Sequence, residues 1–545
     1  TISRYNVLLF FCRRMKLKAL AEEKKKVSES TKHESIECQE SVKLLADWMD
    51  LKISIEDTQC SKPVLINKGF VDTDSIQQHE PEGKHISVQE CEDDNSLVIE
   101  TTGFVDTDSI QQHEPENCKN MDINTAITAG TMTTGIGYAQ MEEMFAAANV
   151  PCMSEKTYIQ HREIVLDEFE KTAIESMKMA GQLEKQLSLE RNEVINNRAY
   201  ITVVADGSWA KRSYGTAYDS LSGVGAIIGY RTRKVLFVGI RSKFCTICHM
   251  AEQKGIQPRS HKCYRNFDRN VSSTRMESDA IAEGFTNSID MHGLIFRTLI
   301  ADGDSNVYQS IINNNPYHEY KITVRKVECT NHLLRNLCKK LKTVSETTEP
   351  KFRRNRNFIK LRNIVKNNIF KIRNDILQLS EYRREEKQPQ HCLATKLRED
   401  VINVPSHIFG EHKRCKEHGR ICENTTNSNE ENYVPHLKSY GQYPKIQNAI
   451  IYLSVYADSL LLKVTNNLAE SFHSVVCAEI GGKRVFYGAR GSYNTRIAAA
   501  VIQHNTQQVL TEFHKNVCTS VPSITENLEK RRQKKTHSLF VTTNV

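Results

Sequence analysis

Two short apolar segments, AYITVVA at residues 199–205 and LIFRTLIA at residues 294–301, decide the fold that we expect. Both are rich in β-branched residues, and each leads directly into a carboxylate, Asp206 after the first and Asp302 after the second. Short apolar runs that end in turn residues are typical of buried strands. The sequence therefore predicts two strands that each deliver an aspartate at the C-terminal end.

The surrounding segments extend this pattern to a sheet. Residues 224–230 and 234–240 are also strand-like, and the Arg-Thr-Arg turn between them predicts a three-strand meander with the first segment. After the second aspartate, the sequence predicts a helix over residues 305–313 and a short strand over residues 321–327. Strands that alternate with helices indicate an α/β fold with its chemistry at the strand ends.

The acidic and basic residues are unevenly distributed along the chain. Residues 34–122 contain 21 Asp and Glu but six Lys and Arg, whereas the remainder contains 45 Asp and Glu and 68 Lys and Arg. This excess of positive charge favours a polyanionic partner, most commonly nucleic acid, over a basic surface that serves solubility alone. No run of about 18 apolar residues occurs, so we expect no transmembrane helix and no membrane partner.

The chain divides into six parts on these patterns. They are a poorly ordered acidic leader (1–125), a helical segment (126–195), the first part of the α/β core (196–332) with a Cys/His insert (245–263), a helical basic insertion (333–460), the second part of the core (461–510) and a basic tail (511–545). The leader holds GFVDTDSIQQHEPE twice, at 69–82 and 103–116, which indicates a duplication in a linker because two copies cannot bury a solenoid core.

The helical segment before the core contains two short apolar patterns. Met141, Met144, Phe145 and Ala148 share a helical face, and Ser154 is a suitable N-cap for the helix that follows. Two helices joined by a tight turn form either a helix-turn-helix or an ordinary αα-hairpin that docks on the core, and both interpretations stay open.

Three acidic residues are candidates for catalysis: Asp206, Asp302 and Glu470. The third lies on a helix predicted to begin near Asn466. Phosphoryl transfer by two metal ions needs oxygen ligands that hold hard cations roughly 3.5–4 Å apart. An Asp-Gly pair after a strand is most often only a turn. Three carboxylates in this order beside a basic body instead favour a metal-dependent phosphodiester chemistry.

Several segments resemble the Mutator-like transposases in the family's order. They are DGSW (206–209), GVGAIIGYRTRKVLFVGIRSKFC (223–245), RMESDAI (275–281), IADGDSNVYQSI (300–311), VECTNHLLRNLCKKL (327–341) and NNLAESFHSVV (466–476). The resemblance covers about residues 135 to 510. It implies an RNase H-like mixed sheet with a helical insertion domain before the last acidic residue.

The resemblance also implies an activity and its partners. Asp206, Asp302 and Glu470 would be the catalytic DDE residues that bind two Mg²⁺ or Mn²⁺ ions, cleave DNA at terminal inverted repeats and transfer the strand to target DNA. A homo-oligomer and a nuclear location are expected. The alternatives are an inactive or domesticated DNA-binding protein, an RNase H-like nuclease for RNA or hybrid, and a zinc-stapled interaction module.

Further residues of these segments are candidates for the same site. Asp304 is an alternative second ligand, and Glu277 corresponds in order to the helix carboxylate of RNase H, or is simply a helix N-terminal acid. Cys329 and His332 match the family's Cys-x-x-His pair, for which we expect a role in organising the active site, with burial of Cys329 as the alternative. Two ligands alone do not complete a zinc site.

Two Cys/His clusters suggest zinc. Cys245, Cys248, His261 and Cys263 have the spacing of a closed structural site, with His249 as a substitute for His261 and free thiols as the alternative. A looser group in the insertion has a less diagnostic spacing and comprises His407, His412, Cys415, His418 and Cys422.

Basic residues near these segments are candidates for DNA contacts. Residues 351–374 contain nine Lys and Arg and no acid, and a Gly-rich stretch after Glu470 adds further cations. The candidates are Arg353, Arg354, Arg356, Lys360, Lys483, Arg484, Arg490 and Arg496. A basic run at residues 530–535 is a weak nuclear-import pattern.

Overall fold

The computed structural model describes residues 121–210, 220–303, 305–415, 431–483, 485–488 and 491–542 of the 545-residue chain. The expected acidic leader with its duplicated segment lies almost entirely outside these residues, as do Asp304, His418, Cys422, Arg484 and Arg490. Within the described part of the chain, no helix has the length and apolar character needed to cross a membrane.

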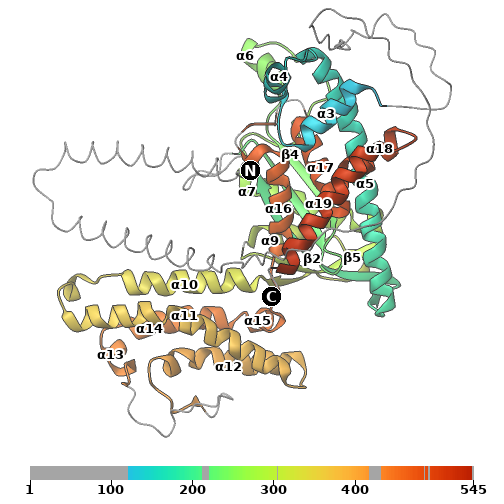
Figure 1. Ribbon diagram of the computed structural model, residues 1–545. Coiled ribbons are helices and arrows are strands. Elements are labelled where there is room, and N and C mark those ends of the chain that lie inside the picture. Colours follow the sequence, from blue (N-terminus) through green and yellow to red (C-terminus); the bar gives the residue numbers. More distant parts are fainter. Residues whose placement is uncertain are drawn as a thin grey trace, which may run out of the picture. The chain divides into compact units, whose positions relative to one another are not determined.

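A six-stranded mixed sheet forms the centre of the described chain (Figure 1). Its strands are β1 (Val194–Ile195), β2 (Arg198–Trp209), β3 (Ser222–Gly229), β4 (Val235–Ser242), β5 (Leu294–Ala301) and β6 (Arg325–Glu328). The order is β4-β3-β2-β5-β6, with β1 paired to β2. Strands β2, β3 and β4 form the predicted antiparallel meander, whereas β5 and β6 continue the sheet in parallel to β2. The α/β class predicted from the sequence is confirmed.

Strand β2 is longer than its apolar segment. Asp206 pairs with Ala226 and Trp209 pairs with Gly223, so the antiparallel ladder with β3 continues past the aspartate. The aspartate therefore lies inside a strand, whereas we expected it at the strand's end. Asp302, in contrast, directly follows the last residue of β5, as predicted.

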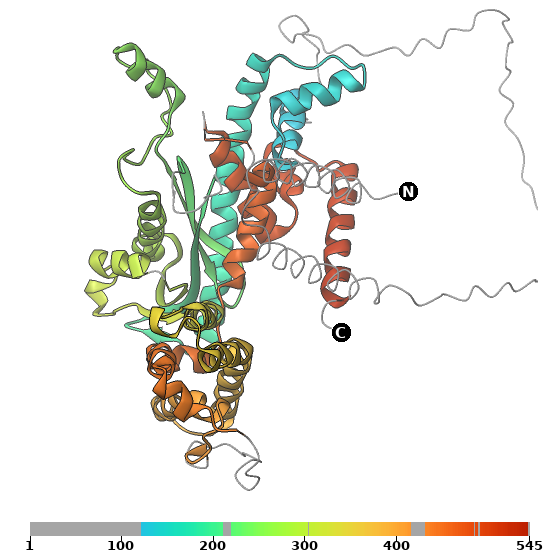
Figure 2. The ribbon, with the colours of Figure 1, turned by 90° about the vertical axis from the view of Figure 1, so that its left-hand side faces the viewer.

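Helices cover both faces of the sheet (Figure 2). One face packs against α7 (Ser273–Thr286), with α8 (Ser288–His292) and α9 (Ser305–Asn314) beside it. The other face packs against α5 (Glu155–Glu190), α16 (Asn467–Glu479) and α17 (Ser492–Thr506). Because alternate residues of a strand point to opposite faces, Val203 joins the α7 core and Val204 the α16 core.

The helices before the sheet are α3 (Ile123–Thr133), α4 (Tyr138–Ala147) and α5. Ser154 caps α5 as predicted, since its Oγ accepts a hydrogen bond from the Thr157 backbone N–H at 3.2 Å. Helix α5 then continues for 36 residues and packs on the sheet and α17. The apolar face expected for α4 is only partly used, because Met141 is buried while Met144 is 56% exposed.

The insertion has a hydrophobic core of its own, built by helices α10 to α15. These helices are α10 (Thr330–Glu346), α11 (Arg356–Glu385), α12 (Gln390–Ile408), α13 (Val434–Ser439), α14 (Gln442–Ser454) and α15 (Ala457–Leu462). Inside this core, the Arg383 guanidinium donates two hydrogen bonds to the carboxylate of Asp400, at 2.6 and 2.9 Å. Both side chains are at least 92% buried.

Three further helices complete the chain around the core. Helix α6 (Thr246–Lys254) follows β4, while α18 (Val509–Val517) and α19 (Ser523–Thr542) follow α17. Phe513 of α18 is completely buried and stacks on Phe169 of α5, with ring centroids 4.8 Å apart. Helix α18 therefore packs onto the long helix that precedes the sheet, and α19 packs against α18.

The buried ion pair of the insertion gives the first prediction. Asp400→Ala should lower the free energy of unfolding by about 3–5 kcal/mol, because the guanidinium of Arg383 would stay buried without its main partner. Urea denaturation followed by circular dichroism measures the change. Glu381→Ala is the control, since its exposed pair with Lys463 should contribute less than about 1 kcal/mol. Equal effects of the two substitutions would contradict this account of the insertion core.

Candidate active site

The two aspartates come together because their strands are neighbours. In the parallel pairing of β2 with β5, Val204 lies opposite Ile300, so Asp206 and Asp302 follow two residues later at matching positions. Adjacent strands lie roughly 4.8 Å apart. Glu470 is in the first turn of α16, which packs on β2 from the face to which Asp206 points. The three predicted carboxylates thus meet at one edge of the sheet.

The electrostatics of Asp206 reflect this meeting. Burial, followed by the negative charges of Asp302 and Glu470, raises the pKa of Asp206 to about 7. A hydrogen bond from the Gly207 backbone N–H to Oδ1, 2.9 Å long, acts in the opposite direction. The site therefore concentrates more negative charge than its own hydrogen bonds neutralise, and a cation would relieve the repulsion.

Asn466 links this cluster to the start of the insertion. Its Nδ2 donates to Oδ2 of Asp206 at 3.5 Å, and its Oδ1 accepts from the buried Cys329 thiol at 3.3 Å. The Asn466 backbone N–H in turn donates to the Cys329 sulfur at 3.5 Å. Cys329 therefore fixes the amide that contacts the catalytic candidate. Among the described residues, Cys329 and His332 do not gather with other ligands into a metal cluster.

Two further side chains lie near Asp206 at this edge of the sheet: the imidazole of His473 and the ammonium group of Lys483. The His473 Nε2 lies 3.9 Å from Oδ2 of Asp206, and burial together with the Lys483 charge lowers the pKa of this imidazole to about 4. Lys483 donates to the Ser208 hydroxyl at 3.0 Å. Asn466 and His473 were not predicted as site residues, although both lie in the NNLAESFHSVV segment, because an amide and a buried histidine carry no distinctive spacing.

Glu277 reaches the same strand from the opposite face. A Cβ atom built on Gly207 would lie 2.4 Å from the Glu277 Cδ, so the carboxyl group of this α7 residue occupies the space that the glycine leaves open. Any larger residue at position 207 would displace it. Glu277 therefore lies beside the backbone of Gly207, next to Asp206, on the α7 side of the sheet.

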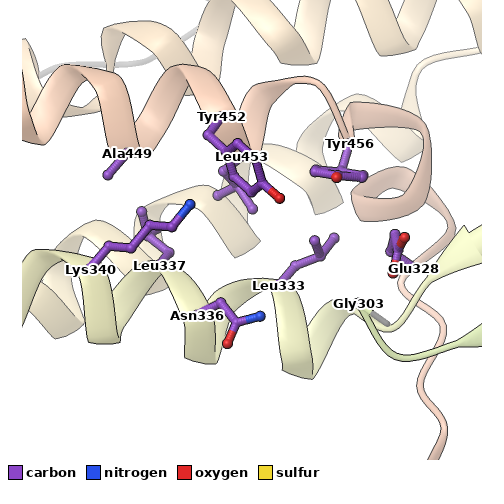
Figure 3. Close-up of a pocket in the computed structure, with 10 residues that line it drawn as sticks. All are labelled: Gly303, Glu328, Leu333, Asn336, Leu337, Lys340, Ala449, Tyr452, Leu453 and Tyr456. Atoms are coloured by element: carbon purple, nitrogen blue, oxygen red, sulfur yellow. The ribbon is translucent and has the colours of Figure 1, made fainter. Parts of the chain in front are cut away.

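A small pocket of about 60 Å³ lies next to Asp302, where the insertion meets the sheet (Figure 3). Gly303 and Glu328 line it on the sheet side, and Tyr456 follows α14 on the other. Burial raises the pKa of Glu328, while its pair with Lys326 at 3.0 Å opposes this rise. The Lys340 ammonium lies 3.4 Å from the centre of the Tyr452 ring. This pocket is too small for a nucleotide.

The first Cys/His cluster is assembled as its spacing predicted. The Nε2 of His261 lies 3.2 Å from the Cys245 sulfur and 3.5 Å from the Cys248 sulfur, which is 3.6 Å from the Cys263 sulfur. Three sulfurs and one imidazole at these separations fit the tetrahedral coordination of zinc, with Zn–S bonds of about 2.3 Å. The cluster could therefore hold a zinc ion.

Second contacts prepare these ligands for a metal. The His261 Nδ1 hydrogen bonds to the Arg259 carbonyl oxygen at 2.7 Å, which leaves Nε2 directed at the sulfurs. Burial of Cys245 disfavours its thiolate, but the backbone N–H groups of Cys248 and Ile247 outweigh it and lower the pKa to about 7.

The second cluster is partly described. His407 Nδ1 and His412 Nδ1 lie 3.2 Å apart, and the buried Cys415 sulfur is 3.4 Å from the former and 3.7 Å from the latter. These three residues also form a group that could hold a metal ion.

The predicted DNA-binding residues have different surroundings. Arg353, Arg354, Arg356 and Lys360 are all exposed at the start of α11. Arg496 is a correction: it is completely buried, and its guanidinium donates to the backbone carbonyls of Met132, Glu479 and Ile136 while it covers the Tyr487 ring at 3.7 Å. It joins α17 to the N-terminal helices and is therefore not available to phosphates.

Comparison with known families matches residues 89–422 to the family model described as Mutator-like transposase. The match covers more than half of the chain and includes Asp206 and Asp302, and Glu470 lies beyond its end. The comparison with curated proteins finds no match.

The first Cys/His cluster predicts a measurable metal content. Cys248→Ser should lower the zinc content of the purified protein by one equivalent, because a closed site needs all four ligands. Plasma mass spectrometry measures this difference. Cys152→Ser is the matched control, since this half-buried cysteine lies in neither cluster. An unchanged zinc content in Cys248→Ser would show that the cluster consists of free thiols.

The raised pKa of Asp206 predicts a pH dependence of stability. Because this pKa is about 7 in the folded chain, whereas the ordinary pKa of an aspartate is 3.8, the folded state binds the proton more tightly than the unfolded state between these pH values. As the pH rises, the free energy of unfolding of the wild type should therefore fall by up to about 4 kcal/mol relative to that of Asp206→Asn. Above pH ~7 the difference should not change further. Urea unfolding without added divalent ions measures both proteins. Parallel profiles for the two proteins would contradict the burial of the Asp206 carboxylate, and the exposed Asp290→Asn provides the control.

Proposed function

Because the chain belongs to the Mutator-like transposase family, we propose that it is a DNA transposase that cleaves and joins DNA at Asp206, Asp302 and Glu470. The observation that carries this proposal is the mutual electrostatic interaction of these three carboxylates, which come from two neighbouring strands and a helix. Carboxylates that lie up to 264 positions apart in the sequence come together here although Asp302 and Glu470 disfavour the charge of Asp206, which favours a functional use of this negative charge.

The topology supports an RNase H-like identity for the core. Three antiparallel strands, followed by two strands parallel to the first, place Asp206 and Asp302 at the same edge. The helical insertion between β6 and α16 then precedes the third acidic residue, as the family resemblance implies.

The three carboxylates fit divalent cations because they are hard oxygen ligands, and burial together with the charges of Asp302 and Glu470 raises the pKa of Asp206. Two bound Mg²⁺ or Mn²⁺ ions would stabilise the attacking and leaving oxygens of an in-line displacement. In this site, Asn466 holds one oxygen of Asp206, so that the carboxylate presents a fixed face to its ligand. Lys483 supplies a positive charge next to Ser208, where it can contact a phosphate of the substrate.

The proposal extends to the partners of the reaction. Terminal inverted repeats and target DNA are the substrates, and a homo-oligomer would hold two element ends together. The basic residues that begin at Lys530 on α19 would direct the protein to the nucleus, where its substrate lies.

A cleavage assay with a labelled duplex that carries the element's terminal repeat tests the proposal. Asp206→Asn should bind the duplex but cleave it at least about 100-fold more slowly, since this exceeds the usual effect of a residue that only orients a ligand. Asn466→Ala should cleave the duplex about 10- to 100-fold more slowly, because Asn466 only orients the Asp206 carboxylate. Asp290→Asn, an exposed change of the same chemistry, is the control.

The outcomes separate the proposal from its competitors. Cleavage that survives in Asp206→Asn removes this residue from the mechanism. Faster cleavage of an RNA–DNA hybrid than of the duplex would instead identify a nuclease of another specificity. A wild-type protein that binds the repeat but never cleaves it would be a DNA-binding protein derived from a transposase.

A further inference from the structure

A groove of about 950 Å³ runs between helices α10 and α11 of the insertion. Its cationic and aromatic lining comprises Arg335, Lys339, Lys342, Lys366, Phe370 and Arg373. On α10, the cations are spaced by four and three residues, and on α11 the three residues are again spaced by four and three. Both stripes therefore follow one face of a helix, and the two faces together form the walls of the groove.

The groove begins at the carboxylate site. Asn331, in the first turn of α10, lines the groove, and its Nδ2 donates to Oδ1 of Asn467 at 3.4 Å. Asn467 is the first residue of α16 and lies three positions before Glu470. From Asn331 to Lys342 the helix rises about 16 Å. The cations thus lead away from the catalytic edge along a continuous path.

The charge of the groove has one sign. Five of the residues that line it are Lys or Arg, and none of the described lining residues is acidic. A groove with this lining favours a phosphate backbone, because each neutralised phosphate releases a condensed counterion. The cations flank the path on both walls, which suits a single strand that lies between them.

Phe370 makes the groove more than a basic surface. Its ring is 70% exposed, although it lies one helical turn from Lys366 and one turn from Arg373. An exposed aromatic ring among cations is the arrangement by which proteins stack an unpaired base while they neutralise its backbone. A base inside a duplex does not present its face to such a ring.

We infer that this groove binds an unpaired DNA strand next to the scissile bond, with its phosphates on the α10 and α11 cations and a base stacked on Phe370. This inference rests on the proposed function for the identity of the nucleic acid. It also shifts the main DNA contact from the start of α11, which the sequence favoured, to its middle.

Fluorescence anisotropy with a labelled 12-nucleotide oligothymidylate tests the inference on the full-length protein without Mg²⁺. Phe370→Leu should weaken binding about tenfold, since stacking on one base has roughly that effect. The same substitution should leave the binding of an abasic strand of equal length unchanged, and Phe370→Trp should bind as wild type. Circular dichroism confirms that each variant is folded. An equal loss with the abasic strand would overturn the stacking.

The phosphate contacts need a second comparison. The triple variant Lys339→Ala, Lys366→Ala, Arg373→Ala should weaken binding and reduce the slope of log K against log salt by about two. The control variant removes three exposed cations outside the groove: Lys171→Ala, Lys515→Ala, Lys530→Ala. Equal behaviour of the two triple variants would overturn the groove, and tighter binding of oligouridylate would identify RNA as its occupant.

These measurements are independent of the cleavage assay. If the wild type binds the single strand through the groove but does not cleave its repeat, the proposed function fails and the groove stands. If it cleaves the repeat while the groove variants bind and cleave as wild type, this inference fails and the proposed function stands.

Discussion

The structure depends on the placement of Asp206 at one edge of the sheet, beside the negative charges of Asp302 and Glu470. Burial of Asp206 beside Asp302 and Glu470 is unfavourable in itself, and the raised pKa of Asp206 expresses this cost. The rigid pairing of β2 with β5 keeps two of the groups together, and the packing of α16 on β2 keeps the third. Asn466 offsets a part of the repulsion with an amide hydrogen bond.

The two ends of the helical insertion are bonded to each other beside the three carboxylates. It leaves the sheet after β6 and returns at Asn466, which bonds Cys329 across 137 residues of sequence. Between these points, the insertion buries its own hydrophobic core, so its fold does not rely on the sheet. A packed core of this kind can hold α10 and α11 rigidly beside the carboxylates, while the sheet holds Asp206 and Asp302 in place.

Local sequence patterns predicted most of the strands well, because each is a short apolar run rich in β-branched residues. The last strand was predicted over residues 321–327 and is Arg325–Glu328. Glu470 follows no strand, and the family resemblance, not a local pattern, assigned it as the third acidic residue. The segment 294–301 coincides with β5. The extension of β2 beyond Asp206 depends on pairing with β3, which no local pattern records. Arg496 was placed on the surface because arginine is usually exposed, whereas its carbonyl partners are up to 364 residues away. The role of Asn466 was not predicted for the same reason, since its partners Cys329 and Asp206 lie 137 and 260 residues away in the sequence.

The bonds of Arg496 have a consequence for synthesis. This residue of α17 joins the carbonyls of Met132 and Ile136, near the beginning of the described chain, to Glu479 near its end. Glu470 likewise joins the sheet only after the whole insertion has been made. A nascent polypeptide on the ribosome therefore exposes a half-finished core until Arg496 has been synthesised, and the three carboxylates can come together only after Glu470. Termination within the insertion would release a protein that keeps Asp206 and Asp302 but lacks Glu470 and the bonds of Arg496.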